Sequence, residues 1–248
     1  MIKLHADSSL LNGDAPLGFA ANCNPEGIEM VNPEKVLQTL QILRERFGPR
    51  VLHSQRDPLD ELVLTILSQN TSDRNSGRAF RELKGRYPSW ASVLNAEASE
   101  LEETIRVGGL AKIKAARIQN TLAVILEQRG EFSLDFLRDL SLHEARAWLT
   151  ALPGIGPKTA GCVLCFACNQ PAMIVDTHIH RVAKRIGMIG PKVSADAAHD
   201  LLEAVVPDDQ MYQFHVSVLL HGRQICHAQR PACERCPLTE ICDFYQAR

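Results

Sequence analysis

The chain has 248 residues, 45% of them hydrophobic, so it can bury a core as one large domain or two of moderate size. Its formal net charge of −2 argues against a uniformly basic nucleic-acid coat, although a local basic face is compatible with that balance. No apolar run approaches the ~20 residues that span a membrane, and residues 1–13 do not resemble a secretory signal, so we expect a cytoplasmic protein without membrane contact.

Helical signals follow one another along the chain after residues 1–30, which show no hydrophobic period and are predicted to form an N-terminal extension. Asn32 and Pro33 suit the N-cap and first position of a helix over 33–47. Ser141 and Glu144 form a capping-box pattern for a helix over 142–151. Further helices are predicted from Pro58, from Thr71 or Ser72, and over 89–94, 97–106, 111–129, 133–139, 157–169, 178–187, 194–206 and 208–221. No stretch alternates as a strand would, so the sequence predicts an all-α protein.

A glycine-rich turn separates two of these helices, at Leu152-Pro-Gly-Ile-Gly-Pro-Lys158. Gly154 and Gly156 allow a tight turn and keep side chains away from the peptide N–H groups around Ile155. Together with the start of the next helix, such groups form a site for an anion such as a DNA phosphate. An ordinary turn between helices is the alternative.

Lys158 lies in the first turn of that following helix, where a cation is disfavoured and the neutral amine of a nucleophile is favoured. Asp176 follows an apolar stretch, so it can cap the next helix or face Lys158 across a cleft. Taken alone, Lys158 also fits a solvated or phosphate-binding lysine.

Four of the eight cysteines gather near the end of the chain as Cys226-x6-Cys233-x2-Cys236-x5-Cys242. Four thiolates can hold either a [4Fe–4S] cluster or Zn²⁺, and the spacing alone does not decide between them. The other run, at Cys162, Cys165 and Cys168, falls on a predicted helix among apolar residues, so we expect it to pack in the core.

The hairpin Leu152–Ala160, followed by Val175-Asp-Thr-His-Ile179 with Arg181, resembles the helix-hairpin-helix and Gly/Pro…Asp signature of the endonuclease III family. The 18-residue step from Lys158 to Asp176 matches that family, as does the position of the four C-terminal cysteines. The resemblance covers about residues 33–248. It implies that Lys158 is the attacking amine, Asp176 the essential carboxylate, and Cys226, Cys233, Cys236 and Cys242 the ligands of a [4Fe–4S] cluster.

The resemblance also implies the architecture. We expect two all-α lobes: a six-helix barrel over 53–170 that ends in the hairpin, and a discontinuous lobe of 31–52 and 171–248 that holds the cluster at 226–242. DNA would lie across the cleft between the lobes.

Base readers are carried over from the family to three places, because an extruded base leaves a gap that the enzyme must fill. These are Gln69 or Asn70 with Asn70 preferred, Leu110, and His178. Phosphate contacts are expected from Lys112 and Lys114, and Arg181 and Arg230 are also predicted to contact DNA. Three positions depart from the family, namely Pro157 for an arginine, Thr150 for a glutamate and His180 for an aromatic residue, and they affect rate and substrate preference.

The resemblance implies a monomeric bifunctional DNA glycosylase and abasic-site lyase that acts on oxidised pyrimidines in double-stranded DNA, with abasic sites as a further substrate. An adenine glycosylase acting opposite oxidised guanine is the nearest alternative, although that family usually lacks the lysine at 158. A non-catalytic iron-sulfur module that binds DNA and senses redox state, and an iron-sulfur nuclease without a glycosylase step, are further alternatives.

Overall fold

The computed structural model describes residues 30–52 and 56–248, so nearly all of the predicted N-terminal extension lies outside the described residues. Within these ranges no strand forms, and Val31 makes one isolated antiparallel bridge with Ile189. The predicted all-α fold is therefore confirmed. None of the described helices combines the length and the apolar character needed to cross a membrane.

The helices of the described ranges agree with the predicted spans to within a few residues, except that the short last helix was not predicted. They are α1 (Pro33–Phe47), α2 (Pro58–Ser68), α3 (Asp73–Arg86), α4 (Trp90–Leu94), α5 (Ala98–Thr104), α6 (Ala111–Arg129), α7 (Leu142–Thr150), α8 (Pro157–Cys162), α9 (Thr177–Ile186), α10 (Ala195–Glu203), α11 (Met211–Gln224) and α12 (Asp243–Gln246). Short 3₁₀ helices are η1 (Arg106–Gly108), η2 (Asp135–Asp139), η4 (Asp208–Gln210), η5 (Cys233–Arg235) and η6 (Thr239–Ile241), and η3 (Val163–Ala167) is a π-helix.

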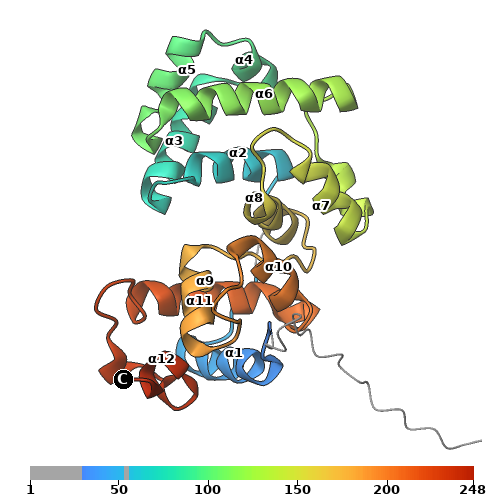
Figure 1. Ribbon diagram of the computed structural model, residues 1–248. Helices are drawn as coiled ribbons and strands as arrows, with labels where there is room; N and C mark the ends of the chain where they lie inside the picture. The colour runs from blue at the N-terminus through green and yellow to red at the C-terminus, as the bar shows by residue number, and fades with distance from the viewer. Residues whose placement is uncertain (1–29, 53–55) are drawn as a thin grey trace, which may run out of the picture.

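The helices form two lobes, as expected, each around its own apolar core (Figure 1). The barrel lobe contains α2 to α8 with η1 to η3. The cluster lobe contains α9 to α12 together with α1, so the start and the end of the described chain share one core. The boundaries predicted for the two lobes stay predictions.

Helix α2 runs through the centre of the barrel lobe and contacts α3, α6, α8 and η3. Asp57 starts it by accepting hydrogen bonds from the peptide N–H groups of Leu59 and Asp60, both at 2.9 Å. Five of its apolar residues have no exposed surface, and burying each such side chain stabilises the fold by about 1.5–3 kcal/mol. These residues are Leu59, Leu62, Val63, Ile66 and Leu67.

The predicted helix 157–169 changes its winding after one and a half turns. The α-helical part ends at Cys162, and η3 continues it as a π-helix in which the Cys168 N–H donates to the Val163 carbonyl at 3.1 Å. Cys162, Cys165 and Cys168 are buried in the barrel-lobe core, which confirms their predicted packing role.

A close backbone approach fixes α8 against the segment that leads to α9. A Cβ atom on Gly161 would lie 2.8 Å from the Met173 carbonyl oxygen and 3.3 Å from the Ile174 side chain. Residues 172–175 of this segment lie outside any helix and are buried, so their backbone polar groups need partners. Met173 N–H donates to Glu203 at 2.8 Å, and Val175 N–H donates to Nε2 of His199 at 3.1 Å.

One sequence prediction is wrong at the start of α6. Lys114 was expected to hold a DNA phosphate, but only 1% of it is exposed and its ammonium binds two backbone carbonyls inside the barrel lobe. The charge of a lysine reveals nothing about the direction of its side chain, and here α6 turns it inward.

Gly161→Ala is predicted to destabilise the protein by about 1–3 kcal/mol, because the added methyl group meets backbone that cannot move cheaply. Gly85→Ala in α3 is the control, since a Cβ there meets nothing within 4 Å, and it should be neutral or slightly stabilising. Thermal unfolding followed by circular dichroism measures both. Equal melting temperatures for the Gly161 variant and the wild type would contradict the close approach.

Candidate active site and cluster centre

The glycine turn forms between α7 and α8 as predicted. Gly154 adopts a positive φ of 74°, and the Ile155 N–H closes the turn on the Leu152 carbonyl at 3.1 Å. The Ile155 side chain is buried in the barrel-lobe core, whereas Gly154 and Gly156 are exposed. The turn is thus anchored from inside, and its glycines face outward.

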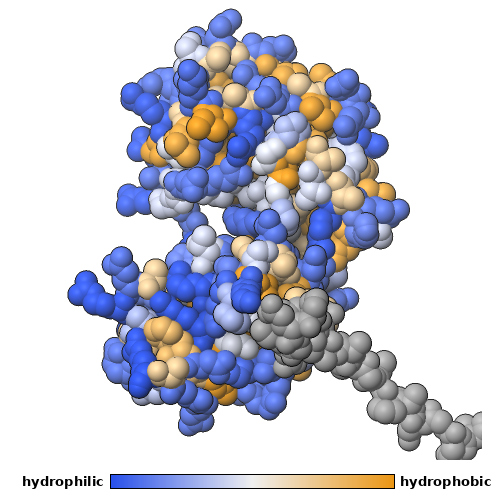
Figure 2. Space-filling view, in the orientation of Figure 1, coloured by the Kyte–Doolittle hydropathy of each residue, from blue (hydrophilic) through white to orange (hydrophobic). Residues whose placement is uncertain are grey.

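A cleft of about 590 Å³ lies between the lobes, and both Lys158 and Asp176 line it. Figure 2 shows the hollow between the lobes, with largely hydrophilic side chains around it. Lys158 comes from the first turn of α8 and Asp176 is the N-cap of α9, so the buried residues 172–175 lie between them in the chain. Both side chains are half-buried.

Asp176 fulfils one of its two predicted roles in the folded chain. Its Oδ1 accepts a hydrogen bond from the Ile179 N–H at 2.8 Å, which caps α9. Because the cap fixes its orientation, the carboxylate is held at the wall of the cleft that also contains Lys158.

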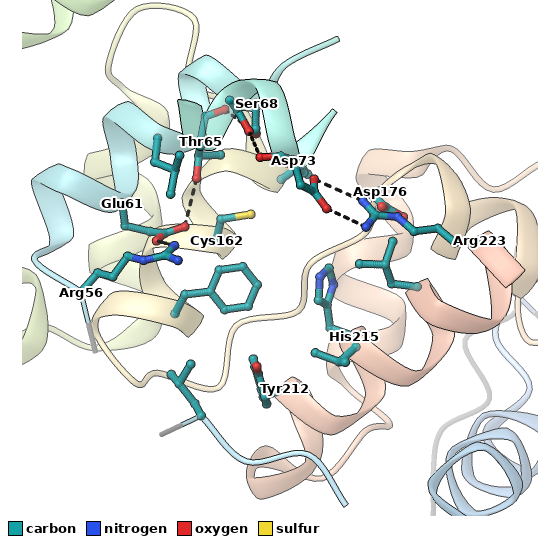
Figure 3. A pocket seen from close by; sticks show the side chains of 18 of the residues that line it. Arg56, Glu61, Thr65, Ser68, Asp73, Cys162, Asp176, Tyr212, His215 and Arg223 are labelled. Atoms are coloured by element: carbon teal, nitrogen blue, oxygen red, sulfur yellow. Dashed lines mark hydrogen bonds and ion pairs between the residues drawn. The ribbon is translucent and has the colours of Figure 1, made fainter. Parts of the chain in front are cut away.

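Glu61 is a buried carboxylate in the same cleft, and the sequence analysis missed it (Figure 3). Its side chain receives a 2.7 Å ion pair from Arg56 and lies 3.4 Å from the Thr65 hydroxyl. Burial raises the pKa of Glu61, and the contact with Arg56 opposes that shift. A carboxylate on the same face of a largely apolar helix as the buried Thr65 was the available signal.

The lobes are joined across the cleft by side chains that the sequence analysis also missed. Arg223 of α11 donates to both carboxylate oxygens of Asp73 in α3, at 2.6 and 3.3 Å, and this pairing lowers the pKa of Asp73 (Figure 3). Phe166 makes edge contacts with Tyr212 and His215, with ring centroids 5.9 and 5.6 Å apart. These pairs are distant in sequence, so no local pattern reveals them.

His215 of α11 is a buried imidazole in the cleft. Its Nδ1 lies 3.1 Å from the Ile174 carbonyl, so Nδ1 carries the proton and donates. Burial lowers the pKa of His215, which favours the neutral ring. The same bond satisfies the buried carbonyl of Ile174. His215 is thus the third side chain, after Glu203 and His199, that hydrogen-bonds the backbone of residues 172–175.

Three candidate DNA-contacting residues share an unusual backbone conformation. Asn70, Leu110 and Arg230 are exposed and have φ of 53°, 49° and 48°. Non-glycine residues in this region cost about 1 kcal/mol or more and cluster at functional sites. Lys112, the second residue of α6, is also exposed.

The other candidates make contacts within the protein. Gln69 ends α2 and receives a hydrogen bond from Arg117. The Arg181 guanidinium donates to the Gly222 and Cys226 carbonyls and lies 3.1 Å from Nδ1 of His178. The structure thus ties His178 and Arg181 to the beginning of the cysteine-rich segment.

The three residues that depart from the family pattern each fit their local structure. Thr150 donates back to the Arg146 carbonyl at 2.8 Å at the end of α7. Pro157 begins α8, as its fixed φ allows. His180 places Nε2 2.9 Å from the Val193 carbonyl.

The four C-terminal cysteines surround one small apolar cavity in the cluster lobe. A [4Fe–4S] cluster takes four thiolate ligands, each bound to a different iron. Four cysteine thiols around one apolar cavity fit that donor set.

Hydrogen-bond donors approach two of these sulfurs. Arg185 lies 3.4 Å from Cys226 Sγ, and the Leu238 N–H lies 3.4 Å from Cys236 Sγ. Burial raises the pKa of Cys236 to about 11, so this thiol ionises at neutral pH only beside a metal cation. When bound, the cluster supplies that cationic centre and cross-links the segment 226–242, and the protein supplies donors that orient the thiolates.

Glu61→Gln is predicted to gain stability relative to the wild type as pH rises. The folded-state pKa of Glu61 is raised, so the folded protein binds more protons than the unfolded chain between the two pKa values, and wild-type stability falls as pH increases from 4.5 toward the folded pKa. The difference in melting temperature, measured between pH 5 and pH 8, should move in favour of the variant. A difference that does not vary with pH would contradict the assignment.

The purified protein is predicted to be brown, with absorption near ~400 nm and about four irons per chain. Cys236→Ser should lose the absorption and most of the iron, because it removes one ligand. Cys165→Ser, a buried cysteine of the barrel lobe, should retain both. Zinc in place of iron, or equal iron loss in the two variants, would contradict the ligand set.

Comparisons with known proteins agree with this site. The model of the HhH-GPD superfamily of base excision DNA repair proteins matches residues 63–208, and the model of the iron-sulfur binding domain of endonuclease III matches residues 226–242. Endonuclease III of Thermotoga maritima is 33% identical over 196 residues, which cover 79% of this chain and 87% of that protein. Endonuclease III of Escherichia coli is 32% identical over 216 residues, covering 86% and 97%.

A putative DNA glycosylase of Arabidopsis thaliana is 40% identical over 168 residues, and the match spans 57% of its length. Among solved structures, a non-covalent endonuclease III–DNA complex superposes with a TM-score of 0.76 and 29% identity, covering 88% of this chain and 99% of that one. From its helix-hairpin-helix, its cysteine segment and these relatives, the chain belongs to the endonuclease III family of DNA glycosylases and abasic-site lyases, and it carries a [4Fe–4S] cluster.

Proposed function

We propose that this enzyme removes oxidised pyrimidines from double-stranded DNA and then cuts the strand, using Lys158 as nucleophile and Asp176 as its partner. The observation that carries the proposal is that an amine and a carboxylate from separate helices line one cleft between the lobes. The exposed glycines of the adjoining turn, Gly154 and Gly156, support it, because they can approach a phosphate without regard to sequence.

Chemistry begins at the sugar of an extruded nucleotide. The neutral Lys158 amine attacks C1′, and the bond from C1′ to the base breaks, with the electron pair leaving on the base. Loss of a proton from the nitrogen and opening of the sugar ring give an imine. The imine makes a C2′ proton acidic, and its removal expels the 3′ phosphate by β-elimination. Water then releases the lysine.

Asp176 assists the step at C1′ by accepting a proton from the amine and by stabilising positive charge on the sugar. Its cap on α9 keeps the carboxylate oriented before the substrate arrives. The polar groups of Glu61, Thr65 and His215 in the same cleft offer hydrogen-bond partners to an extruded base.

Gap filling is assigned to Asn70 and Leu110, and also to His178 and to Gln69, the neighbour of Asn70. Backbone contacts are assigned to Lys112, Arg181, Arg230 and the peptide groups around Ile155. Support comes from the strained and exposed backbone at Asn70, Leu110 and Arg230. A covalent route is consistent with a solved relative, described as a trapped covalent endonuclease III–DNA intermediate, which is 28% identical to this chain with a TM-score of 0.75.

We further propose that the enzyme acts as a monomer in the compartment that holds the DNA. The family membership sets aside a non-catalytic module. Base release from a panel of duplexes carrying thymine glycol, other oxidised pyrimidines, or adenine opposite oxidised guanine separates the proposed substrate class from the adenine alternative.

Borohydride reduction is predicted to cross-link the wild-type enzyme to abasic DNA, since it converts the imine to a stable amine. Lys158→Gln should lose at least about 10³-fold in trapping while binding the same duplex, because it keeps the fold but removes the nucleophile. Lys84→Gln is the control, since that lysine pairs with Asp60 on the barrel-lobe surface. Undiminished trapping by Lys158→Gln, or none by the wild type, would refute the lyase mechanism.

A further inference from the structure

Lys114 is a buried lysine for which the proposed chemistry has no use. Its ammonium donates to the Leu67 carbonyl at 2.7 Å and to the Gly108 carbonyl at 2.7 Å, and only 1% of the residue is exposed. Burial lowers the pKa of Lys114. A buried ammonium is costly unless it is hydrogen-bonded, so both carbonyls are required partners.

Each carbonyl lies at the end of a helical turn, just before a loop to which the proposed function assigns a DNA contact. Leu67 is followed by Ser68, the last residue of α2, and then by Gln69 and Asn70, while Gly108 ends η1 and is followed by Leu110 after one residue. Carbonyls at helix ends lack a helical partner and sit at the negative end of the dipole, so a cation satisfies both needs.

The ends of α2 and η1, from which the two loops lead, also lie close together. A Cβ on Gly108 would lie 3.2 Å from the Ala79 side chain and 3.9 Å from the Leu67 carbonyl oxygen. Lys114 therefore closes a contact at which the two turns already meet, and its two hydrogen bonds fix their separation.

Arg117 extends the same face of α6 to the hairpin. It lies one turn after Lys114, donates to Gln69, and packs so closely on Gly154 that a Cβ there would be 2.6 Å from its Nε. One face of α6 thus contacts three barrel-lobe turns that carry proposed DNA contacts.

We propose that Lys114 is a positioning residue that holds the Asn70 loop and the Leu110 loop at a fixed separation, so that both enter the DNA as one preformed unit. The inference rests on the proposed function, because it assigns gap filling to these loops. Extruding a base costs a few kcal/mol, and loops that were ordered only on binding would add the cost of ordering to that step.

Amide hydrogen exchange of the free protein tests the fixed separation without any activity. The reporters are amides in turn hydrogen bonds, namely Gln69 and Thr71 in one loop and Gly108 and Gly109 in the other. Lys114→Met keeps the apolar stem but removes the donor, so exchange should quicken at least about tenfold in both loops together. Lys112→Met, an exposed lysine of the same helix, should change neither loop.

Lys114→Arg is the second variant, because a guanidinium has enough donors to reach both carbonyls. It should retain most of the protection, and it decides the question if the Met variant does not fold. Quickened exchange in one loop alone, unchanged exchange in Lys114→Met, or loss of protection in a folded Lys114→Arg would overturn the inference.

A double-mutant cycle with Leu110→Gly connects the positioning role of Lys114 to catalysis. In single-turnover base release from a damaged duplex, Lys114→Met and Leu110→Gly should each lose about tenfold or more, and the double variant should lose little beyond Leu110→Gly. Multiplying losses would mean that Lys114 does not act through Leu110. If the wild type releases no base, the proposed function fails, and hydrogen exchange alone decides the role of Lys114.

Discussion

The buried segment 172–175 is the constraint on which the rest of the site depends. It passes α8 where Gly161 leaves room only for a hydrogen atom, and the side chains of Glu203, His199 and His215 satisfy its backbone. Lys158 precedes this crossing and Asp176 follows it. Because the crossing is fixed by backbone contact and by buried hydrogen bonds, the distance across the cleft is set by the protein interior and does not await the substrate.

The second lobe forms because the last part of the chain packs against α1, the first described helix. Helix α1 contributes to the cluster-lobe core, so the two ends of the described chain close around the cysteine segment, and Arg181 and Arg185 tie α9 to that segment through its carbonyls and a sulfur. The cluster therefore lies behind the helix that Asp176 caps. A cluster bound there would hold in place the segment against which α9 packs.

The helices were predictable because caps and apolar periods are local. Asn32 and Ser72 cap the expected helices, and Ser141 pairs with Glu144 as its pattern indicates. The family resemblance supplied the roles of Lys158, Asp176 and the four cysteines. The sequence could not reveal the inward turn of Lys114, the π-helical widening after Cys162, or the Asp73–Arg223 pair, because each depends on tertiary neighbours. Glu61 was hidden within a mostly buried helix, where nothing in the sequence sets it apart from its neighbour Asp60.

The central claim is that the amine beside Asp176 forms the bond to the sugar. Digesting the borohydride-trapped complex with nuclease and trypsin, and sequencing the modified peptide by mass spectrometry, identifies the attached residue directly. The account predicts a sugar adduct on Lys158, within a peptide between Arg146 and Arg181. An adduct on another lysine or on the N-terminal amine, with Lys158 unmodified, would contradict it.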